Sequence, residues 1–162
     1  ADESRTLGQI ETWDDLTRAL DPLRTSDNVI VAFRITGTFE SVDLRAACKH
    51  APGTDLVTAT ADQGLIDVTN ISGSVVGFWS PEYAKAISIA GYHLHFISDD
   101  RKHGGHVLQA KASGLVAEVH RVSDVHLAIP ETKAFLEADL TRDTTAALEE
   151  AEHAERGEAK PS

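Results

Sequence analysis

The chain has 162 residues, enough for one domain with a hydrophobic core, and its 41% hydrophobic and 25% charged residues are ordinary for a globular protein. Its formal net charge of −11, from 26 Asp and Glu against 15 Lys and Arg, argues against a nucleic-acid partner. No apolar run approaches the roughly 18 residues of a membrane span, and no signal peptide is recognised. The single cysteine, Cys48, cannot form an internal disulfide, so we expect a cytoplasmic protein.

Helical spacing is the first regular pattern along the chain. Residues 1–11 predict a loosely ordered lead-in, and Thr12 with Asp15 then forms a capping box. Apolar residues recur from Trp13 to Leu23 at helical spacing, which predicts a helix over 12–24.

Two β-rich segments follow this helix. Residues 29–35 are rich in β-branched side chains, and Thr36-Gly37-Thr38 joins them to a second segment over 39–44, which predicts an N-terminal hairpin. Residues 46–63 are less regular, with Pro52-Gly53 as a turn signal.

From Gly64 the chain becomes strongly β. The nearly continuous apolar run Gly73–Trp79 predicts a buried strand, and Ser80-Pro81-Glu82 predicts the start of a short helix that ends near Gly91. Further strands are predicted at Tyr92–Ser98, His106–Ala112, Leu115–Arg121 and Val125–Ile129. The segment from Pro130 predicts helix, chiefly over 142–154.

These elements predict an α+β fold. We expect a mixed or antiparallel curved sheet, or a barrel-like β core, with flanking helices at 12–24 and 142–154. Residues 1–162 are expected to form one domain, with 157–162 as a disordered tail.

Three histidines form the strongest functional pattern. In the predicted strand from Tyr92, His93 and His95 share one face because strand side chains alternate. The polar linker Ser98–Gly105 ends in two glycines and predicts a hairpin, which brings His106 on the returning strand within reach of the pair. Three imidazoles with an open fourth position are the usual layout of a catalytic zinc site. We therefore expect residues 1–162 to form a single metal-binding domain of catalytic type.

The alternative is that these histidines are surface or hydrogen-bonded core residues, as isolated histidines usually are. The third histidine across a Gly-Gly hairpin favours a metal, because a buried polar trio otherwise needs other partners. His103 lies in the predicted turn and is expected to be exposed. The remaining histidines have no comparable geometry.

The segment GSVVGFWSPEYAKAISIAGYHLHFISDDRKHGGHV (73–107) closely resembles the bacterial alpha-acetolactate decarboxylases. The resemblance continues into Asn28–Arg45 and into Pro130–Glu152, so it covers most of the chain. It implies that His93, His95 and His106 bind Zn²⁺, and that the small-molecule substrate is a hydroxy-keto acid. It also implies a homodimer.

The resemblance places two further residues in the site. Arg45 matches a family arginine that points into the site, although the family usually has a second basic residue where this chain has Asp43. Ungapped alignment from His93 places the family's C-terminal glutamate at Glu152, with Glu149 and Glu150 as near neighbours. A solvated helix end is the other interpretation of this acidic segment.

The family's longer N-terminal part, which supplies a sheet and another active-site glutamate, matches no segment here. The chain is therefore expected to be a fragment, a cleaved chain or a short relative.

The resemblance implies a zinc-dependent lyase that converts acetolactate to acetoin. We expect Arg45 to hold the departing carboxylate or the hydroxyl, and Glu152 to donate the proton. Two alternatives stay open. One is a related metalloenzyme acting on another hydroxy-keto acid, and the other is a non-catalytic metal-binding module.

Overall fold

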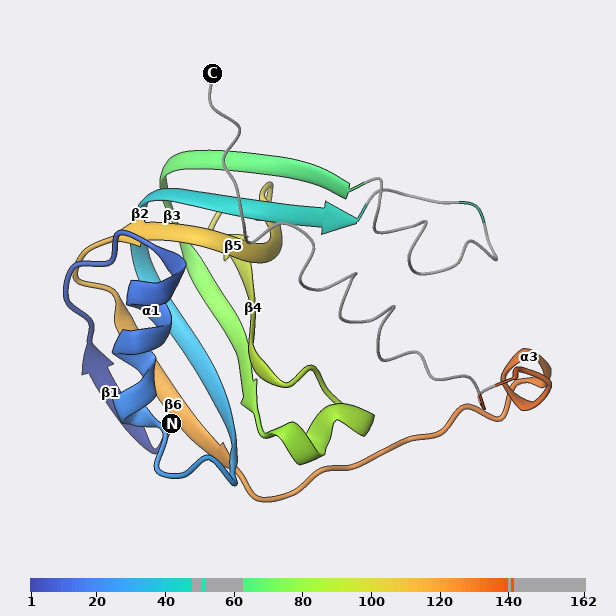
Figure 1. The fold of residues 1–162 in the computed structure, drawn as a ribbon. Coiled ribbons are helices and arrows are strands. Elements are labelled where there is room, and N and C mark those ends of the chain that lie inside the picture. The colour runs from blue at the N-terminus through green and yellow to red at the C-terminus, as the bar shows by residue number, and fades with distance from the viewer. Residues whose placement is uncertain (48–50, 52–62, 140, 142–162) are drawn as a thin grey trace. The chain divides into compact units, whose positions relative to one another are not determined.

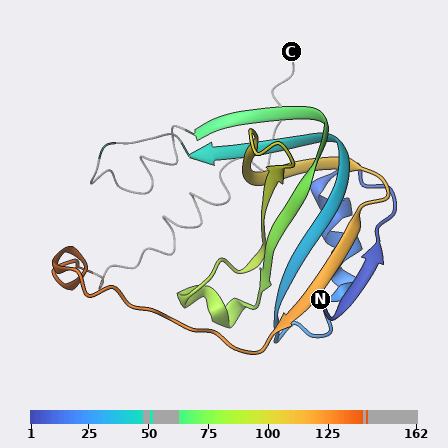
Figure 2. The same ribbon diagram turned by 180° about the vertical axis from the view of Figure 1, so that it is seen from behind.

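The computed structural model describes residues 1–47, 51, 63–139 and 141. The chain divides into two compact units, one of Ala1–Ala46 with Gly64–Ser123 and one of Ala47–Gln63 with Asp124–Ser162. The first unit holds a six-stranded, mostly antiparallel sheet that is strongly curved (Figures 1 and 2). The predicted α+β class with a curved sheet is thus confirmed, and the sheet is not a clear barrel.

The sheet follows the order β1-β6-β2-β3-β4-β5, and β5 also pairs with β2. The strands are β1 Glu3–Thr6, β2 Ile30–Ala47, β3 Gln63–Ser80, β4 Gly91–Ser98, β5 Gly104–Ala112 and β6 Val116–Val122. The helices are α1 Trp13–Leu20, η1 Asp21–Leu23, η2 Glu82–Ala86 and α3 Lys133–Leu136. In the part of the chain that the structure describes, none of these helices has the length and apolar character needed to span a membrane.

The predicted N-terminal hairpin is wrong, because residues 30–47 form the single strand β2. Its first part, Ile30–Thr36, pairs with β6, and its second part, Phe39–Arg45, pairs with β5. Gly37 lies at the change of partner with φ +152°, and a Cβ there would lie 2.8 Å from Leu115 Cδ2. The glycine therefore lets one strand bend past β6 and does not reverse the chain.

Three other segments also differ from their predictions. The lead-in contains β1, which pairs with β6 and is followed by the buried Leu7 and Ile10. The helix after Ser80 is a 3₁₀ helix confined to Glu82–Ala86, and Ser80 itself belongs to β3. Residues 125–129 form no strand, and their apolar side chains are exposed, so the alternating pattern there is not matched by burial. The predicted helix over 142–154 lies outside the described residues.

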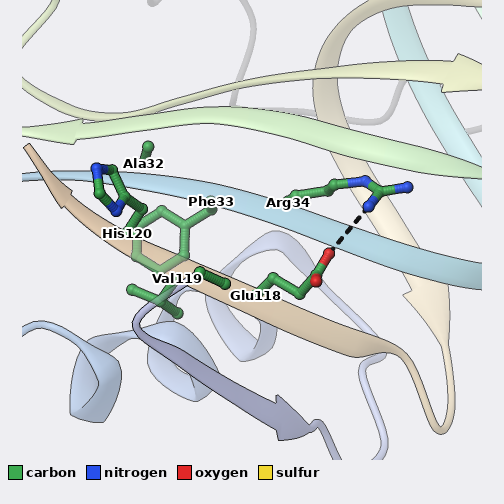
Figure 3. A pocket seen from close by; sticks show the side chains of 7 residues that line it. Ala32, Phe33, Arg34, Glu118, Val119 and His120 are labelled. Atoms are coloured by element: carbon green, nitrogen blue, oxygen red, sulfur yellow. Dashed lines mark hydrogen bonds and ion pairs between the residues drawn. The ribbon is translucent and has the colours of Figure 1, made fainter.

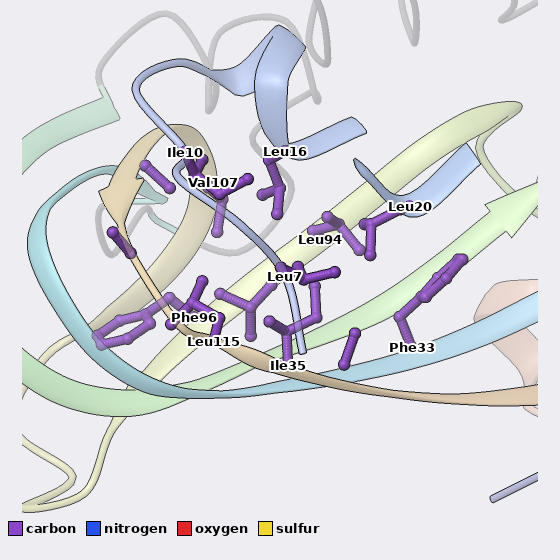
Figure 4. Packing of buried hydrophobic residues seen from close by; sticks show 14 of the residues in the cluster. Leu7, Ile10, Leu16, Leu20, Phe33, Ile35, Leu94, Phe96, Val107 and Leu115 are labelled. Atoms are coloured by element: carbon purple, nitrogen blue, oxygen red, sulfur yellow. The ribbon is translucent and has the colours of Figure 1, made fainter. Parts of the chain in front are cut away.

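The predicted helix over 12–24 is confirmed as α1 followed by η1. Thr12 caps α1, its Oγ1 accepting the Asp15 N–H at 3.2 Å. Leu16 and Leu20 of α1 are fully buried and pack with side chains of β2, β4, β5 and the turn before β6 (Figure 4). This helix face therefore closes the core on one side of the sheet.

A polar cluster around Arg24 joins the end of this helical segment to β3 and β4. The Arg24 guanidinium lies 4.1 Å from the centroid of the Trp79 ring and forms 2.8 Å ion pairs with Asp21 and Asp27. The Tyr92 hydroxyl donates to Asp21 Oδ1 at 2.9 Å, and burial raises the pKa of this phenol well above its usual range. The cluster thus anchors the start of β4.

Strands β3 and β4 approach each other closely at Gly77. A Cβ at this position would overlap the carbonyl oxygen of His93 and lie 2.9 Å from the Cα of Leu94. We predict that Gly77→Ala lowers the free energy of unfolding by about 1–3 kcal/mol, because backbone atoms must shift to admit the methyl group.

Urea unfolding of the Gly77→Ala protein measures this loss. Gly8→Ala is the matched control, because a Cβ at Gly8 meets nothing within 4 Å. Equal stability of the two variants would show that β3 and β4 separate without cost.

Candidate metal centre

The hairpin of β4 and β5 brings three histidines together on one face of the sheet. Along β4, Leu94 and Phe96 are buried in the core, whereas His93 is half-buried and His95 is exposed on the opposite face. His106 of β5 is the Cα partner of His95, so both side chains lie on the same face. The predicted convergence of these three histidines is therefore found.

The ring nitrogens of the trio are close enough to share one ion. Each imidazole offers one nitrogen, and the three nitrogens lie within 4.8 Å of one another. His93 Nε2 and His95 Nε2 are 3.0 Å apart. Two nitrogens bound tetrahedrally to zinc at 2.0–2.1 Å would be about 3.3 Å apart. The arrangement therefore suits a divalent ion, which would draw the three nitrogens to a common distance.

The burial of the trio is graded from one strand to the next. His106 is only 6% exposed, and both of its ring nitrogens are shielded from solvent, whereas His95 is open to water. A metal ion held by the trio would thus have its most buried ligand in His106 and its most exposed ligand in His95. A catalytic metal site additionally requires a coordination position left open for water or substrate.

The turn between β4 and β5 is fixed by Ser98. Its N–H donates to the His103 carbonyl at 2.9 Å, and its hydroxyl accepts the His103 N–H at 3.0 Å and donates to Asp100 at 2.6 Å. These bonds leave His103 half-buried, so the expectation that it is exposed is wrong.

The two glycines after the turn allow close approach of the strands. A Cβ at Gly105 would lie 2.7 Å from the carbonyl oxygen of Arg45, and one at Gly104 would lie 3.1 Å from that of Phe96. The Gly-Gly pair therefore sets the position of His106 between β4 and β2.

Arg45 lies beside the trio. It is the Cα partner of His106 across β2 and β5, so its side chain is on the histidine face, and it is only 8% exposed. Its neighbour Leu44 is fully buried on the core face. The arginine expected from the resemblance is thus placed next to His106.

The candidate glutamates Glu149, Glu150 and Glu152 lie outside the described residues. Their role therefore stays a prediction.

Asp43 shares the strand face of Arg45, because Val42 and Leu44 on either side of it are fully buried in the core. Burial, together with the negative charge of Asp67 on β3, raises the pKa of the Asp43 carboxyl above its usual range. This carboxylate thus disfavours the folded state when it is ionised.

We predict that Asp43→Asn raises the melting temperature at pH 7. A carboxyl whose pKa is higher in the folded state binds its proton more readily there, so its destabilising effect is complete above that pKa and fades as the pH falls through it. The gain should therefore shrink between pH 7 and pH 4. Thermal unfolding at pH 7 and at pH 4 measures the gain in melting temperature, and Asp99→Asn, at an exposed position, is the control. A lower melting temperature at pH 7 would indicate that Asp43 makes a stabilising contact.

Residues 73–79 of β3 were predicted to form a buried strand, and this is wrong for one face of the strand. Val75 is fully buried, but Val76 and Phe78 are 42% and 47% exposed on the histidine face. The exposure of Val76 and Phe78 could have been inferred from their pairing with His95 and His93, which lie on the solvent-facing side of β4. That inference requires the register of β3 against β4, which local sequence does not give.

A concavity lies on β2 and β6, and its lining includes none of the three histidines (Figure 3). Its volume is about 310 Å³, and Arg34 and Glu118 in its wall form an ion pair at 3.1 Å. Its histidine, His120, lies 3.4 Å from Asp2 and has no second histidine among the lining residues. It therefore offers no comparable metal site.

Comparisons with known proteins identify the family of this chain. The family model for alpha-acetolactate decarboxylase matches residues 1–142. The chain is 34% identical to the alpha-acetolactate decarboxylase of Brevibacillus brevis over 151 residues, covering 93% of this chain and 53% of that protein. It is also 34% identical to that of Bacillus licheniformis over 145 residues, covering 88% and 56%. The chain thus spans about half the length of the curated relatives it matches.

Solved structures give the same result. The crystal structure of alpha-acetolactate decarboxylase from Bacillus subtilis strain 168 matches 93% of this chain and 65% of its own, with a TM-score of 0.84 and 30% identity. A Staphylococcus aureus protein described as similar to alpha-acetolactate decarboxylase matches 96% of this chain and 66% of its own, with a TM-score of 0.86 and 29% identity. From the extent of the family match and these identities, we conclude that the chain belongs to the alpha-acetolactate decarboxylase family.

Proposed function

We propose that this chain acts in the zinc-dependent decarboxylation of acetolactate to acetoin, a carboxy-lyase reaction. The observation that carries the proposal is the placement of His93, His95, His106 and Arg45 on one sheet face in a chain of this family. Acetolactate carries a carboxylate, an adjacent tertiary hydroxyl and a ketone. Arg45 suits the carboxylate, and an ion held by the histidines would suit the hydroxyl and the ketone.

The histidines are proposed to hold the metal. Imidazole nitrogens suit zinc and several other divalent ions, so the donor set alone does not select one, and zinc comes from the family resemblance. When bound, the ion supplies a Lewis acid for the hydroxyl and ketone oxygens.

Arg45 is proposed to bind the substrate carboxylate. A guanidinium presents paired N–H donors that match a carboxylate, and its burial beside His106 excludes water that would weaken these bonds. Holding the carboxylate orients the bond that breaks as carbon dioxide leaves. The electron pair of that bond passes to the ketone, and the resulting enediolate must then be protonated to give acetoin.

Glu152 is the proposed proton donor, with Glu149 and Glu150 as alternatives. A carboxylic acid with a pKa near the working pH is suited to this step. Replacing each of the three by glutamine, and measuring acetoin formation and metal content, identifies the donor. The donor variant should lose activity and keep its metal.

Acetoin release tests the whole proposal. The chain is stripped with a chelator, reloaded with zinc and supplied with racemic acetolactate, and acetoin should form only in the reloaded sample. Bound zinc without acetoin would instead favour a related enzyme for another hydroxy-keto acid. Bound zinc without turnover of any such acid would favour a non-catalytic metal-binding module.

We further propose that the protein acts as a homodimer in the cytoplasm, as the resemblance and the single cysteine led us to expect. Sedimentation of the zinc-loaded chain measures the oligomeric state.

A further inference from the structure

Close to the histidines, their sheet face carries exposed apolar side chains. We name three of these the apolar rim: Val76 and Phe78 of β3 and Ile97 of β4. They are 42%, 47% and 46% exposed. Phe78 is the Cα partner of His93, and Val76 is the Cα partner of His95. The solvent face of an antiparallel sheet is normally polar, so an apolar surface around imidazoles needs an explanation.

The core does not account for the rim. The alternating residues on the same two strands, Val75, Leu94 and Phe96, are at most 2% exposed and fill the core from the opposite face. The rim side chains therefore lie outside the core cluster, and they form an apolar surface beside the histidines.

The register places one rim residue in line with the site. Across β3, β4, β5 and β2, the successive Cα partners are Val76, His95, His106 and Arg45. Residues directly opposite on antiparallel strands have Cβ atoms about 4.5–5.5 Å apart and point to the same side. The row thus runs from an apolar side chain, through two imidazoles, to a buried guanidinium.

We propose that the apolar rim is the subsite for the alkyl groups of the substrate, with Val76 and Phe78 contacting them. This inference rests on the proposed function, because it takes the ligand to be a hydroxy-keto acid held at the histidines. Such an acid has a carboxylate at one end, an alkyl group at the other and chelating oxygens between them. The row Arg45, His106, His95, Val76 presents the matching chemistry in the same order.

Binding of unreactive acids tests the subsite without relying on turnover. Lactate, 2-hydroxybutyrate and 2-hydroxyvalerate carry the carboxylate and hydroxyl, lack the ketone, and differ by one methylene each. Calorimetric titration of the zinc-loaded full chain should give affinities that rise by up to about fourfold per methylene. In Val76→Ser and Phe78→Ser this increase should fall to less than half, with zinc content unchanged.

Val116→Ser is the matched control, since Val116 is an exposed valine (38%) on β6, away from the row. It should keep the full increase per methylene. Should Val76→Ser fail to fold, Val76→Thr keeps the side-chain shape and gives the same comparison.

Two results would overturn the subsite. One is an affinity in the wild-type chain that does not depend on alkyl length. The other is an unchanged increase in Val76→Ser together with a shift in its sedimentation, which would make the rim an interface between chains. Failure of the subsite and failure of the proposed reaction can be told apart. The affinity can rise with alkyl length in a chain that releases no acetoin, and acetoin can form in a chain whose affinity does not depend on alkyl length.

Discussion

His106→Ala should lower the affinity for zinc by more than about 100-fold, because loss of an outer-shell partner alone typically costs 10–100-fold and His106 would be a direct ligand. It is also the most buried of the three imidazoles, so no water can readily take its place. The variant should lose the thermal stabilisation that zinc gives the wild-type chain, which is about 2.7 kcal/mol at a free-ion concentration of 100 times Kd. Competition with a chromophoric chelator measures the affinity, and thermal unfolding with and without zinc measures the stabilisation.

His120→Ala provides the control for this experiment. His120 lies on β6 beside Asp2 and is outside the trio, so its removal should leave zinc affinity unchanged. Equal losses in the two variants would mean that zinc binds elsewhere, and the trio would then have another role.

Arg45→Gln should reduce kcat/KM for acetolactate by about 10- to 150-fold, which corresponds to the 1.5–3 kcal/mol of a hydrogen bond to a charged group. Arg45→Lys should recover part of this loss, since lysine keeps the charge but not the paired donors. Zinc affinity should stay equal or rise in Arg45→Gln, because a positive charge next to His106 opposes the binding of a cation.

Arg34→Gln is the control on the same strand, where Arg34 is exposed and paired with Glu118. It should leave both activity and zinc affinity unchanged. A joint loss of zinc and activity in Arg45→Gln would show that Arg45 maintains the fold of the hairpin and does not act on the substrate.

Local patterns predicted the elements whose partners are close in sequence. The cap at Thr12 and the helical spacing after it gave α1, and the alternation from Tyr92 with the Gly-Gly turn gave β4 and β5. In each case the interaction that decides the structure spans only a few residues, so the sequence contains it directly.

Elements that depend on distant partners were missed. Gly37 could equally have formed a turn or a bend, and the choice is made by β6 and β5, which pair with the two parts of β2. The strand Glu3–Thr6 forms only because β6 offers it an edge. The neighbourhood of Arg45 and His106, 61 positions apart, likewise comes from strand register, and before the structure only the family resemblance indicated it.

Because the three histidines come from two strands, metal binding by the trio reports whether β4 and β5 have paired in the native register. A slip of β5 by one residue against β4 would turn His106 into the core and set Val107 or Gly105 beside His95. Metal binding therefore stabilises the native register of the hairpin and does not stabilise registers shifted by one residue. Refolding followed by the absorbance of bound cobalt would time the moment at which these strands reach that alignment, independently of any reaction.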